Sequence, residues 1–228
     1  MSIAWLFPGQ GSQAVGMGKE IFEASAAARA VFEEADSALG EKLSKLVFEG
    51  PIEELTLTAN AQPAIVTTSI ALLAALREKL PEIEAPAFAA GHSLGEYSAL
   101  VSAGALSLSD AVRLVRARGR AMQEAVPAGV GAMAAIMGME PDPVREVCKE
   151  ASIDGEVVSP ANFNAPGQIV IAGHKGAVAR ASELVGARKG KAIALNVSAP
   201  FHCALMAPAA RVVEDKLASV TVNVPKFP

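Results

Sequence analysis

Apolar positions recur with a helical period through most of the first half of the chain, interrupted by short apolar runs. The runs at 3–7 and 85–90 are bounded by Pro and Gly and predict buried strands. Helices are predicted at about 19–39, 61–80, 94–103 and 109–125. Strands alternating with helices favour an α/β fold with a parallel sheet.

The pattern changes after Pro127, where six shorter elements follow one another. Strands are predicted at 132–137, 156–162, 168–172 and 191–197, and helices at 143–151 and 177–187. This βαββαβ order is the ferredoxin-like arrangement. We therefore predict a small domain over 128–198, inserted into a larger α/β domain made of 1–127 and 199–228.

The last segment predicts an amphipathic helix at about 204–220, followed by the beginning of a strand at 221–224. The apolar side of that helix would carry Leu205, Ala209, Val212, Val213, Leu217 and Val220.

Composition restricts the class of protein. A chain of 228 residues that is 51% hydrophobic and 19% charged is globular, and its net charge of −4 argues against nucleic-acid binding. Cys148 and Cys203 are too few for a disulfide framework and lack metal-site spacing, which predicts a reducing cytoplasm and no metal. The longest apolar segment, 64–76, falls short of the roughly 20 residues that a bilayer requires, so no membrane span is predicted.

Gly91-His92-Ser93-Leu94-Gly95 fits the G-x-S-x-G nucleophile elbow of α/β-hydrolase-like folds. Small residues on both sides let the backbone take a strained turn that exposes the serine hydroxyl. Many turns contain Gly and Ser, so the motif alone also fits an ordinary turn serine. The strand predicted before residues 91–95 and the helix predicted after them favour a nucleophile.

A serine nucleophile needs a base, and the chain has three histidines. His92 adjoins Ser93, and neighbouring side chains usually diverge, so a packing role is the alternative for it. His174 ends a strand of the inserted domain and fits a solvated loop. His202 follows the return of the chain into the large domain and is the predicted base, although a core histidine bonded to backbone is an alternative.

Arg118 lies nearly opposite Arg113, Arg116 and Arg120 on the predicted helix, among apolar neighbours. A guanidinium in such surroundings needs an anion, which is either a protein carboxylate or a substrate. The other three arginines are predicted to form a solvated face or, with Arg188, Lys189 and Lys191 of the predicted insert, a surface that docks an acidic protein.

The turn Gly9-Gln10-Gly11 after the first strand allows two further interpretations. With Ala14 and Asp36 it forms a degenerate dinucleotide-binding fingerprint, which would make the protein a non-catalytic nucleotide-binding module. Alternatively, its backbone amides point at an oxyanion.

Four blocks together resemble the malonyl-CoA:acyl carrier protein transacylase family. They are Pro8-Gly9-Gln10-Gly11-Ser12-Gln13; Gly91 to Tyr97; Arg118-Gly119 with Met122-Gln123; and Pro200 to Met206, in the family's order. The resemblance covers the chain from residue 7 to about 210.

The resemblance implies a ping-pong transfer of a malonyl group from malonyl-CoA to the phosphopantetheine thiol of acyl carrier protein, in fatty-acid biosynthesis. Ser93 would be acylated, His202 would take its proton, and the amides of Gln10 and Leu94 would bind the oxyanion. Arg118 would hold the malonyl carboxylate and Phe201 would crowd the substrate's α-carbon. No resident cofactor is implied, since CoA and phosphopantetheine are carriers of the substrates.

The resemblance also implies that family members continue beyond residue 228. The C-terminal part of the large domain is therefore expected to be missing, and no residue is assigned to orient His202. The alternative function is a serine esterase or thioesterase that uses the same Ser93 and His202 with water as acceptor.

Overall fold

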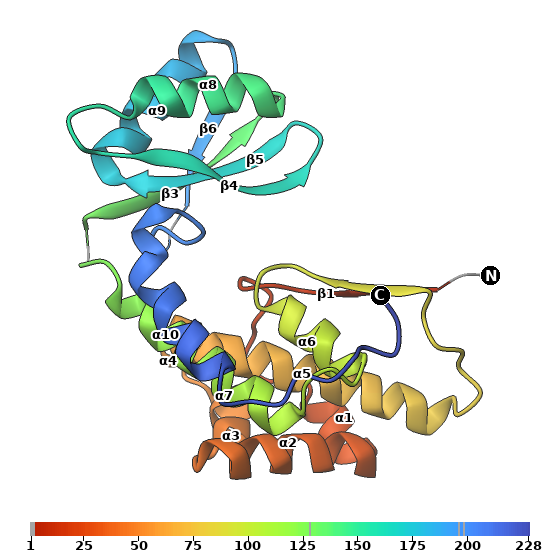
Figure 1. Ribbon diagram of the computed structural model, residues 1–228. Coiled ribbons are helices and arrows are strands. Elements are labelled where there is room, and N and C mark those ends of the chain that lie inside the picture. Colours follow the sequence, from red (N-terminus) through yellow and green to blue (C-terminus); the bar gives the residue numbers. More distant parts are fainter. Residues whose placement is uncertain (1–2, 128, 196, 198) are drawn as a thin grey trace. The chain divides into compact units, whose positions relative to one another are not determined.

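The computed structural model describes residues 3–127, 129–195, 197 and 199–228, and it contains two compact units (Figure 1). The first unit consists of residues 1–120 and 213–228, and the second unit of 121–212. The second unit is wider than the insert predicted over 128–198. Its boundaries fall inside the helices α7 (Leu108–Glu124) and α10 (Ala207–Leu217).

The first unit is mostly helical and contains a small parallel sheet. Its strands β1 (Ala4–Phe7) and β2 (Phe88–Gly91) pair in parallel, from Ala4 opposite Phe88 to Phe7 opposite Gly91. Its helices before α7 are α1 (Lys19–Ala24), α2 (Ala26–Leu39), α3 (Leu43–Glu49), α4 (Ile52–Thr56), α5 (Thr58–Lys79) and α6 (Gly95–Ser102). The parallel pairing and the alternation of strands with helices confirm the α/β class.

The single helix predicted over 19–39 is wrong, because the chain breaks it at Ser25. Ser25 is extended, at φ −126° and ψ 125°, and its side chain accepts a hydrogen bond from the N–H of Ala28 at the start of α2. A serine that caps a helix in this way begins a new helix and ends the continuity of the previous one. The short α3 and α4 were not predicted, since five to seven residues are too few to show a period.

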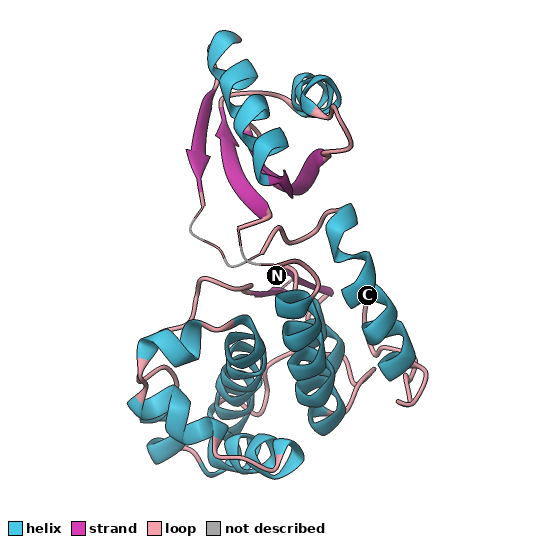
Figure 2. Ribbon diagram, turned by 90° about the vertical axis from the view of Figure 1, so that its left-hand side faces the viewer, coloured by secondary structure: helices cyan, strands magenta, loops and turns pink. Residues whose placement is uncertain are grey.

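α5 is the central helix of the first unit and lies beside α2 (Figures 1 and 2). It is the one helix in the described ranges that is long and apolar enough to cross a membrane, but 61% of its apolar window is buried inside the protein. Its buried residues pack against α2, α3, α6 and α7, with Ile65 and Val66 in one cluster and Ala64 and Ala71 in another. This burial explains its apolarity without a membrane.

The C-terminal segment of the first unit differs from the prediction. The residues at 221–224 form no strand; instead the N–H groups of Asn223 and Lys226 donate to the carbonyls of Ala105 and Ala103. The predicted helix over 204–220 is a 3₁₀ turn, Ala204–Met206, followed by α10. Of its predicted apolar side, Val212 and Leu217 are 40% and 37% exposed.

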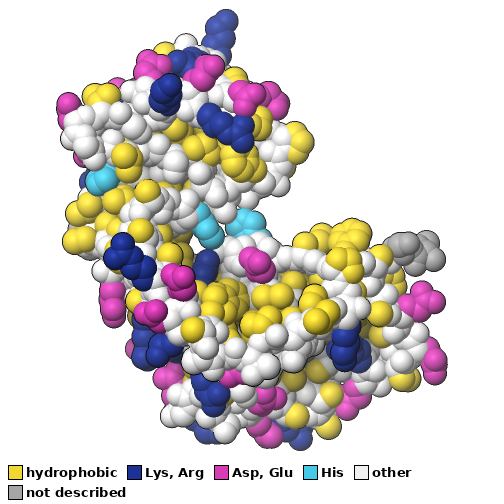
Figure 3. Space-filling view, viewed as in Figure 1, with side chains coloured by type: hydrophobic (Ala, Val, Ile, Leu, Met, Phe, Trp, Pro, Cys, Tyr) yellow, Lys and Arg dark blue, Asp and Glu magenta, His cyan; other side chains and the backbone are white. Residues whose placement is uncertain are grey.

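Hydrophobic side chains gather at the surface over β1 (Figure 3). Leu6 is 75% exposed and Phe88, in the paired strand, is 51% exposed. On the described residues, one side of this sheet therefore meets solvent.

The second unit contains the six predicted elements in the predicted order. They are β3 (Gly131–Met137), α8 (Pro141–Ala151), β4 (Val158–Ala165), β5 (Gln168–His174), α9 (Lys175–Ala187) and β6 (Lys191–Ala194). The strands form one antiparallel sheet in the order β4-β5-β3-β6. Figures 1 and 2 show α8 and α9 on the same side of the sheet.

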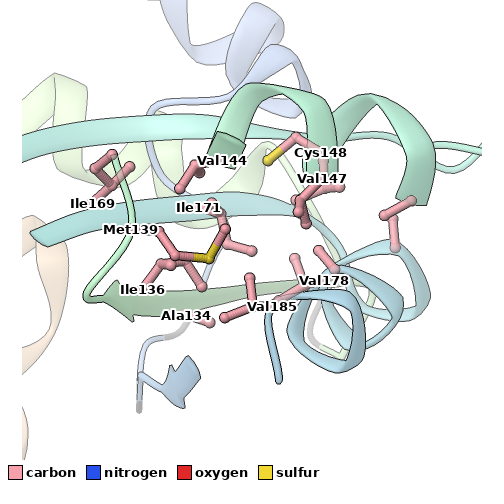
Figure 4. Packing of buried hydrophobic residues seen from close by; sticks show 14 residues of the cluster. Ala134, Ile136, Met139, Val144, Val147, Cys148, Ile169, Ile171, Val178 and Val185 are labelled. Carbon is pink, nitrogen blue, oxygen red and sulfur yellow. The ribbon is translucent and has the colours of Figure 1, made fainter. Parts of the chain in front are cut away.

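A dry core joins these two helices to the sheet (Figure 4). Ile136 and Ile171 project from neighbouring strands toward Val144, Val147 and Val185 of the helices, and all five side chains are almost completely buried.

A second cluster covers the other face of the sheet and explains the width of the second unit. Met122, in the last turn of α7, and Val126, just after that helix, pack with Phe201 and Met206, and Met133 of β3 contributes from the sheet. Residues on both sides of the predicted insert are therefore part of the same packing.

Cys148 of α8 lies in the core of the second unit, where burial raises the pKa of its thiol to about 11. At pH 8 this shift leaves about 100-fold less thiolate than an exposed cysteine would have, so we expect native Cys148 to resist a thiol reagent such as DTNB. The labelling rate should increase about tenfold per pH unit up to about pH 10, and labelling should become complete in urea. Peptide mass mapping would assign the site, with Cys148→Ala as control; rapid labelling of native Cys148 at pH 8 would contradict the buried position.

Candidate active site

The predicted elbow is present. β2 ends at Gly91 and α6 begins at Gly95, and between them Ser93 has φ 54°, in the left-handed region. A serine with this conformation is strained by about 1 to 3 kcal/mol and persists only where its surroundings hold it. Hydrogen bonds from Gly95 N to His92 O (2.9 Å) and from Glu96 N to Ser93 O (3.1 Å) close the turn, and Leu94, 1% exposed, anchors it in the core.

Both glycines of the motif are required by close backbone approach. A Cβ on Gly91 would lie 1.9 Å from the carbonyl carbon of Gly95, and a Cβ on Gly95 would lie 2.5 Å from the carbonyl oxygen of Phe7. No side chain fits at such distances. The glycines therefore allow the turn itself and the contact between the end of β1 and the elbow.

The Gly9-Gln10-Gly11 turn lies against the elbow. A Cβ on Gly9 would lie 2.5 Å from Nδ1 of His92, which shows how closely the turn approaches the residue before Ser93. The side chain of Gln10 donates to Oγ1 of Thr58 (3.0 Å), at the start of α5. Among the hydrogen bonds of the described residues, none uses the N–H of Gln10 or of Leu94, so both amides are available to an oxyanion.

Arg118 reaches Ser93 from α7. Its Nη2 donates to Oγ of Ser93 at 3.0 Å, and its Nη1 donates to Oε1 of Gln62 at 2.6 Å. Within the described part of the chain, no carboxylate lies within 4.0 Å of this guanidinium. The structure therefore answers the question that the sequence left open: the anion that Arg118 needs is not a protein carboxylate in direct contact.

The surroundings of Arg118 are poorly solvated. Burial lowers the pKa of Arg118, whereas the nearby Tyr97 hydroxyl and Glu96 carboxylate act in the opposite direction. Burial also raises the pKa of Tyr97. Arg118 stays charged at neutral pH, because an arginine begins far above that range.

The prediction that Arg113, Arg116 and Arg120 share a solvated face is wrong for Arg116. Arg113 and Arg120 are exposed, but Arg116 is only 8% exposed and its guanidinium pairs with Glu41 and with Oδ1 of Asn60. The helical spacing placed these residues correctly around α7, but it could not show that α5 and the residues before α3 would cover one of them.

Gln62 and Thr58 are site residues that sequence reasoning missed. Both are about 1% exposed, and they hold the side chains of Arg118 and Gln10 respectively. The available signal was weak, because the buried polar residues of α5 include Thr67, Thr68 and Ser69 as well as Thr58 and Gln62.

His202 and Phe201 belong to the second unit. His202 is exposed and has φ 59°, and it follows a loop that packs tightly on β3, where a Cβ on Gly131 would lie 2.3 Å from Pro200. Phe201 is 8% exposed in the cluster with Met133, which also accepts a hydrogen bond from the Phe201 N–H at 3.3 Å. The loop thus buries the phenyl ring and leaves the imidazole exposed.

The remaining candidates have structural partners. Nδ1 of His174 accepts from the N–H of Val157 at 3.0 Å, beside the start of α9. The carboxylate of Asp36, the acid of the dinucleotide-binding interpretation, accepts from the N–H and the hydroxyl of Ser44 at 2.8 and 2.7 Å. Asp36 therefore holds the start of α3, which removes the ribose-binding acid from that interpretation.

The described residues contain no group of three or more His, Cys, Asp or Glu side chains that could hold a metal ion. The chemistry of the site is that of a strained serine hydroxyl beside a cation and two backbone amides. Such an arrangement suits acyl transfer to an oxygen nucleophile from a substrate that carries a negative charge.

Comparisons with known proteins agree with this chemistry. The acyl transferase domain family matches residues 4–228. A malonyl CoA-acyl carrier protein transacylase from Bacillus subtilis (strain 168) is 57% identical over 217 residues, which are 94% of this chain and 67% of the relative.

Solved structures show the same fold at full coverage of the chain. An acyl carrier protein S-malonyltransferase from Vibrio cholerae superposes with a TM-score of 0.95 at 48% identity, over 100% of this chain and 74% of that one. A malonyl-transacylase in complex with a type II PKS acyl-carrier protein has a TM-score of 0.94 at 46% identity, over 100% of this chain and 73% of that one.

The close approach at Gly95 makes a direct prediction. In Gly95→Ala the new Cβ would meet the carbonyls of Phe7 and Pro8, at 2.5 and 2.8 Å, and would push the Gln10 turn away from the elbow. We expect acylation of Ser93 by a thioester substrate to fall about 100-fold, the effect of losing one oxyanion donor. Intact-mass measurement would follow the acylation, with Gly186→Ala in α9 as matched control, since a Cβ there meets nothing within 4 Å. An unchanged acylation rate in Gly95→Ala would contradict the interpretation that the Gln10 amide binds the oxyanion.

Proposed function

Because the chain belongs to the malonyl CoA-acyl carrier protein transacylase family, whose activity is transfer of a malonyl group from malonyl-CoA to acyl carrier protein, we propose that Ser93 carries that group between the two. The observation that carries the proposal is the 3.0 Å hydrogen bond between Nη2 of Arg118 and Oγ of Ser93. It places a cation beside the nucleophile, in the region where the carboxylate of a short acyl group on that oxygen would lie.

The transfer takes place in two halves. In the first, Oγ of Ser93 forms a bond to the thioester carbonyl carbon while His202, from the second unit, takes the hydroxyl proton. The C–S bond then breaks, and the CoA sulfur leaves with the proton returned by His202. In the second half the phosphopantetheine thiol of the carrier gives its proton to His202 and attacks the malonyl ester, and Ser93 leaves and recovers a proton.

Two backbone amides stabilise the negative oxygen of each tetrahedral intermediate. We assign this role to the N–H groups of Gln10 and Leu94, supported by the contact of the Gly9 turn with His92 and by the absence of other hydrogen bonds to these two amides among the described residues. Each such donor is typically worth a factor of about 10² to 10³ in rate.

Arg118 and Phe201 provide substrate selection in this proposal. An acetyl group would leave the guanidinium without its carboxylate, and removing one partner of a buried pair costs about 3 to 5 kcal/mol. Arg118 is only partly buried, so the lower end of that range or less applies here. Phe201 would crowd the substrate's α-carbon, where an added methyl costs about 1 to 3 kcal/mol.

We further propose that the six elements of the second unit form a ferredoxin-like domain over 128–198, inserted into an α/β-hydrolase-like large domain. Support comes from the strand order β4-β5-β3-β6 and from the strand, elbow and helix around Ser93. The transfer needs no resident cofactor, since CoA and phosphopantetheine carry the acyl group. The two free cysteines fit a reducing cytoplasm.

Acyl carrier protein is the second substrate, and we propose that exposed lysines of the second unit help to dock it. Of the basic residues predicted for this role, Arg116 is buried with Glu41, Arg113 pairs with Asp110, and Arg188 pairs with Glu146 and Glu150. Lys189 and Lys191 are exposed, and no ion pair within 4.0 Å involves them in the described part of the chain. Of the predicted residues Arg120 of α7 is also exposed, and in the second unit these two lysines are the candidates to meet an acidic carrier.

Substitution of Arg118 tests the proposed function. Arg118→Ala should reduce formation of malonyl-Ser93 about 100-fold while acetyl-Ser93 formation increases relative to it, because only malonate uses the guanidinium. Intact-mass kinetics with malonyl-CoA and acetyl-CoA would give both rates. Equal losses for the two substrates would refute a carboxylate-binding role for Arg118.

Salt dependence tests the carrier-docking proposal. Lys189→Gln/Lys191→Gln should raise KM for acyl carrier protein severalfold and weaken its dependence on ionic strength, without changing acylation by malonyl-CoA. Lys42→Gln, an exposed lysine of the first unit beside Asp36, is the control. A KM for the carrier that is insensitive to salt in the unmodified enzyme would contradict docking by these lysines.

A further inference from the structure

Arg116 is a buried cation that takes no part in the transfer chemistry above. It lies two residues before Arg118, which is about 200° around α7, so the two side chains leave the helix on nearly opposite sides. Nevertheless both guanidinium groups bind the first turns of α5: Arg116 through Ala59 and Asn60, and Arg118 through Gln62.

The sequence of α5 explains why Arg116 binds there. Pro63 lies inside the helix and has no N–H, so the carbonyl of Ala59, four residues earlier, lacks its helical partner. Nη1 of Arg116 donates to that carbonyl at 2.9 Å. The same guanidinium pairs with Glu41, whose side chain is 46% exposed, so the charge of Arg116 is balanced at its outer end.

Gly119 lies between the two arginines around the helix, at a point where the backbones of α7 and α5 almost touch. A Cβ on Gly119 would lie 2.6 Å from the carbonyl oxygen of Thr58 and 2.7 Å from Cα of Ala59. Because Gly119 has no side chain to interlock with α5, this contact does not by itself prevent α7 from rotating about its own axis. The start of α5 is therefore bound by Arg116 on one side of this contact and by Arg118 on the other.

We propose that Arg116 is a positioning residue for malonyl selection, which sets the roll of α7 on α5 and thereby holds the Arg118 guanidinium at Ser93. This inference rests on the carboxylate-binding role proposed for Arg118. A roll of 10° about the helix axis moves a group at guanidinium distance by about 1 Å, and a misplacement of that size can cost up to about 100-fold in rate.

The test is the ratio of malonyl-Ser93 to acetyl-Ser93 formation in the full chain, because this ratio does not depend on the amount of folded enzyme. In Arg116→Met the ratio should fall about tenfold, through loss of the malonyl rate. Arg116→Lys keeps the charge opposite Glu41 but cannot reach all three partners at once, so the ratio should fall less; this variant also serves if Arg116→Met folds poorly. Arg113→Met, an exposed arginine of the same helix paired with Asp110 at 3.7 Å, should leave the ratio unchanged.

A double variant separates positioning from general damage. If Arg116 acts through Arg118, malonyl transfer in Arg116→Met/Arg118→Ala should equal that of Arg118→Ala alone within about twofold. A further loss in the double variant would overturn the inference, and so would an unchanged ratio in Arg116→Met, whether both rates fall equally or neither falls. Arg118→Ala alone separates failure of the proposed function from failure of this inference. If Arg118→Ala loses malonyl and acetyl transfer equally, the carboxylate-binding role of Arg118 fails, and the positioning role of Arg116 fails with it. If Arg118→Ala selectively loses malonyl transfer but Arg116→Met does not change the ratio, only the positioning role of Arg116 is refuted.

Discussion

The candidate site depends on backbones that approach one another more closely than side chains would permit. At the elbow, Gly91 lies against the backbone of Gly95, and Gly95 in turn lies against the carbonyl of Phe7. These contacts hold the strained Ser93 between a strand and a helix, with the Gly9 turn beside it. The strain is local and modest, and the burial of Leu94 together with the hydrogen bonds of the turn offsets it.

A similar approach at Gly119 makes the start of α5 the centre of the polar part of the site. Thr58 holds the side chain of Gln10, and Gln62 holds the guanidinium of Arg118. Amide and hydroxyl partners position the cation without neutralising it, as a carboxylate would. In the proposed function, selection for a charged acyl group would follow from the complex with an uncharged substrate, because a poorly solvated guanidinium without its anion would destabilise that complex.

The second unit supplies the proposed base from a different kind of scaffold. Two apolar clusters cover the two faces of one antiparallel sheet, and the loop that bears His202 belongs to the second of them. Phe201 is packed in that cluster while the next residue is exposed in a left-handed conformation. Packing of one side chain thus determines the orientation of its neighbour.

The linear sequence was sufficient for features that depend on local periodicity and on motif spacing. The order of the six elements in the second unit, the strand and helix around Ser93 and the separate position of Arg118 on α7 are of this kind, because each is decided by residues within a few positions of one another. Pairings across the chain were decided only by the tertiary structure. α5 covered Arg116, and Thr58 and Gln62 became residues of the candidate site, since their burial and hydrogen-bond partners depend on segments some 50 or more positions away that no local pattern records. The break at Ser25 is different, because its cap is a local contact with Ala28 that the periodicity of apolar positions did not show.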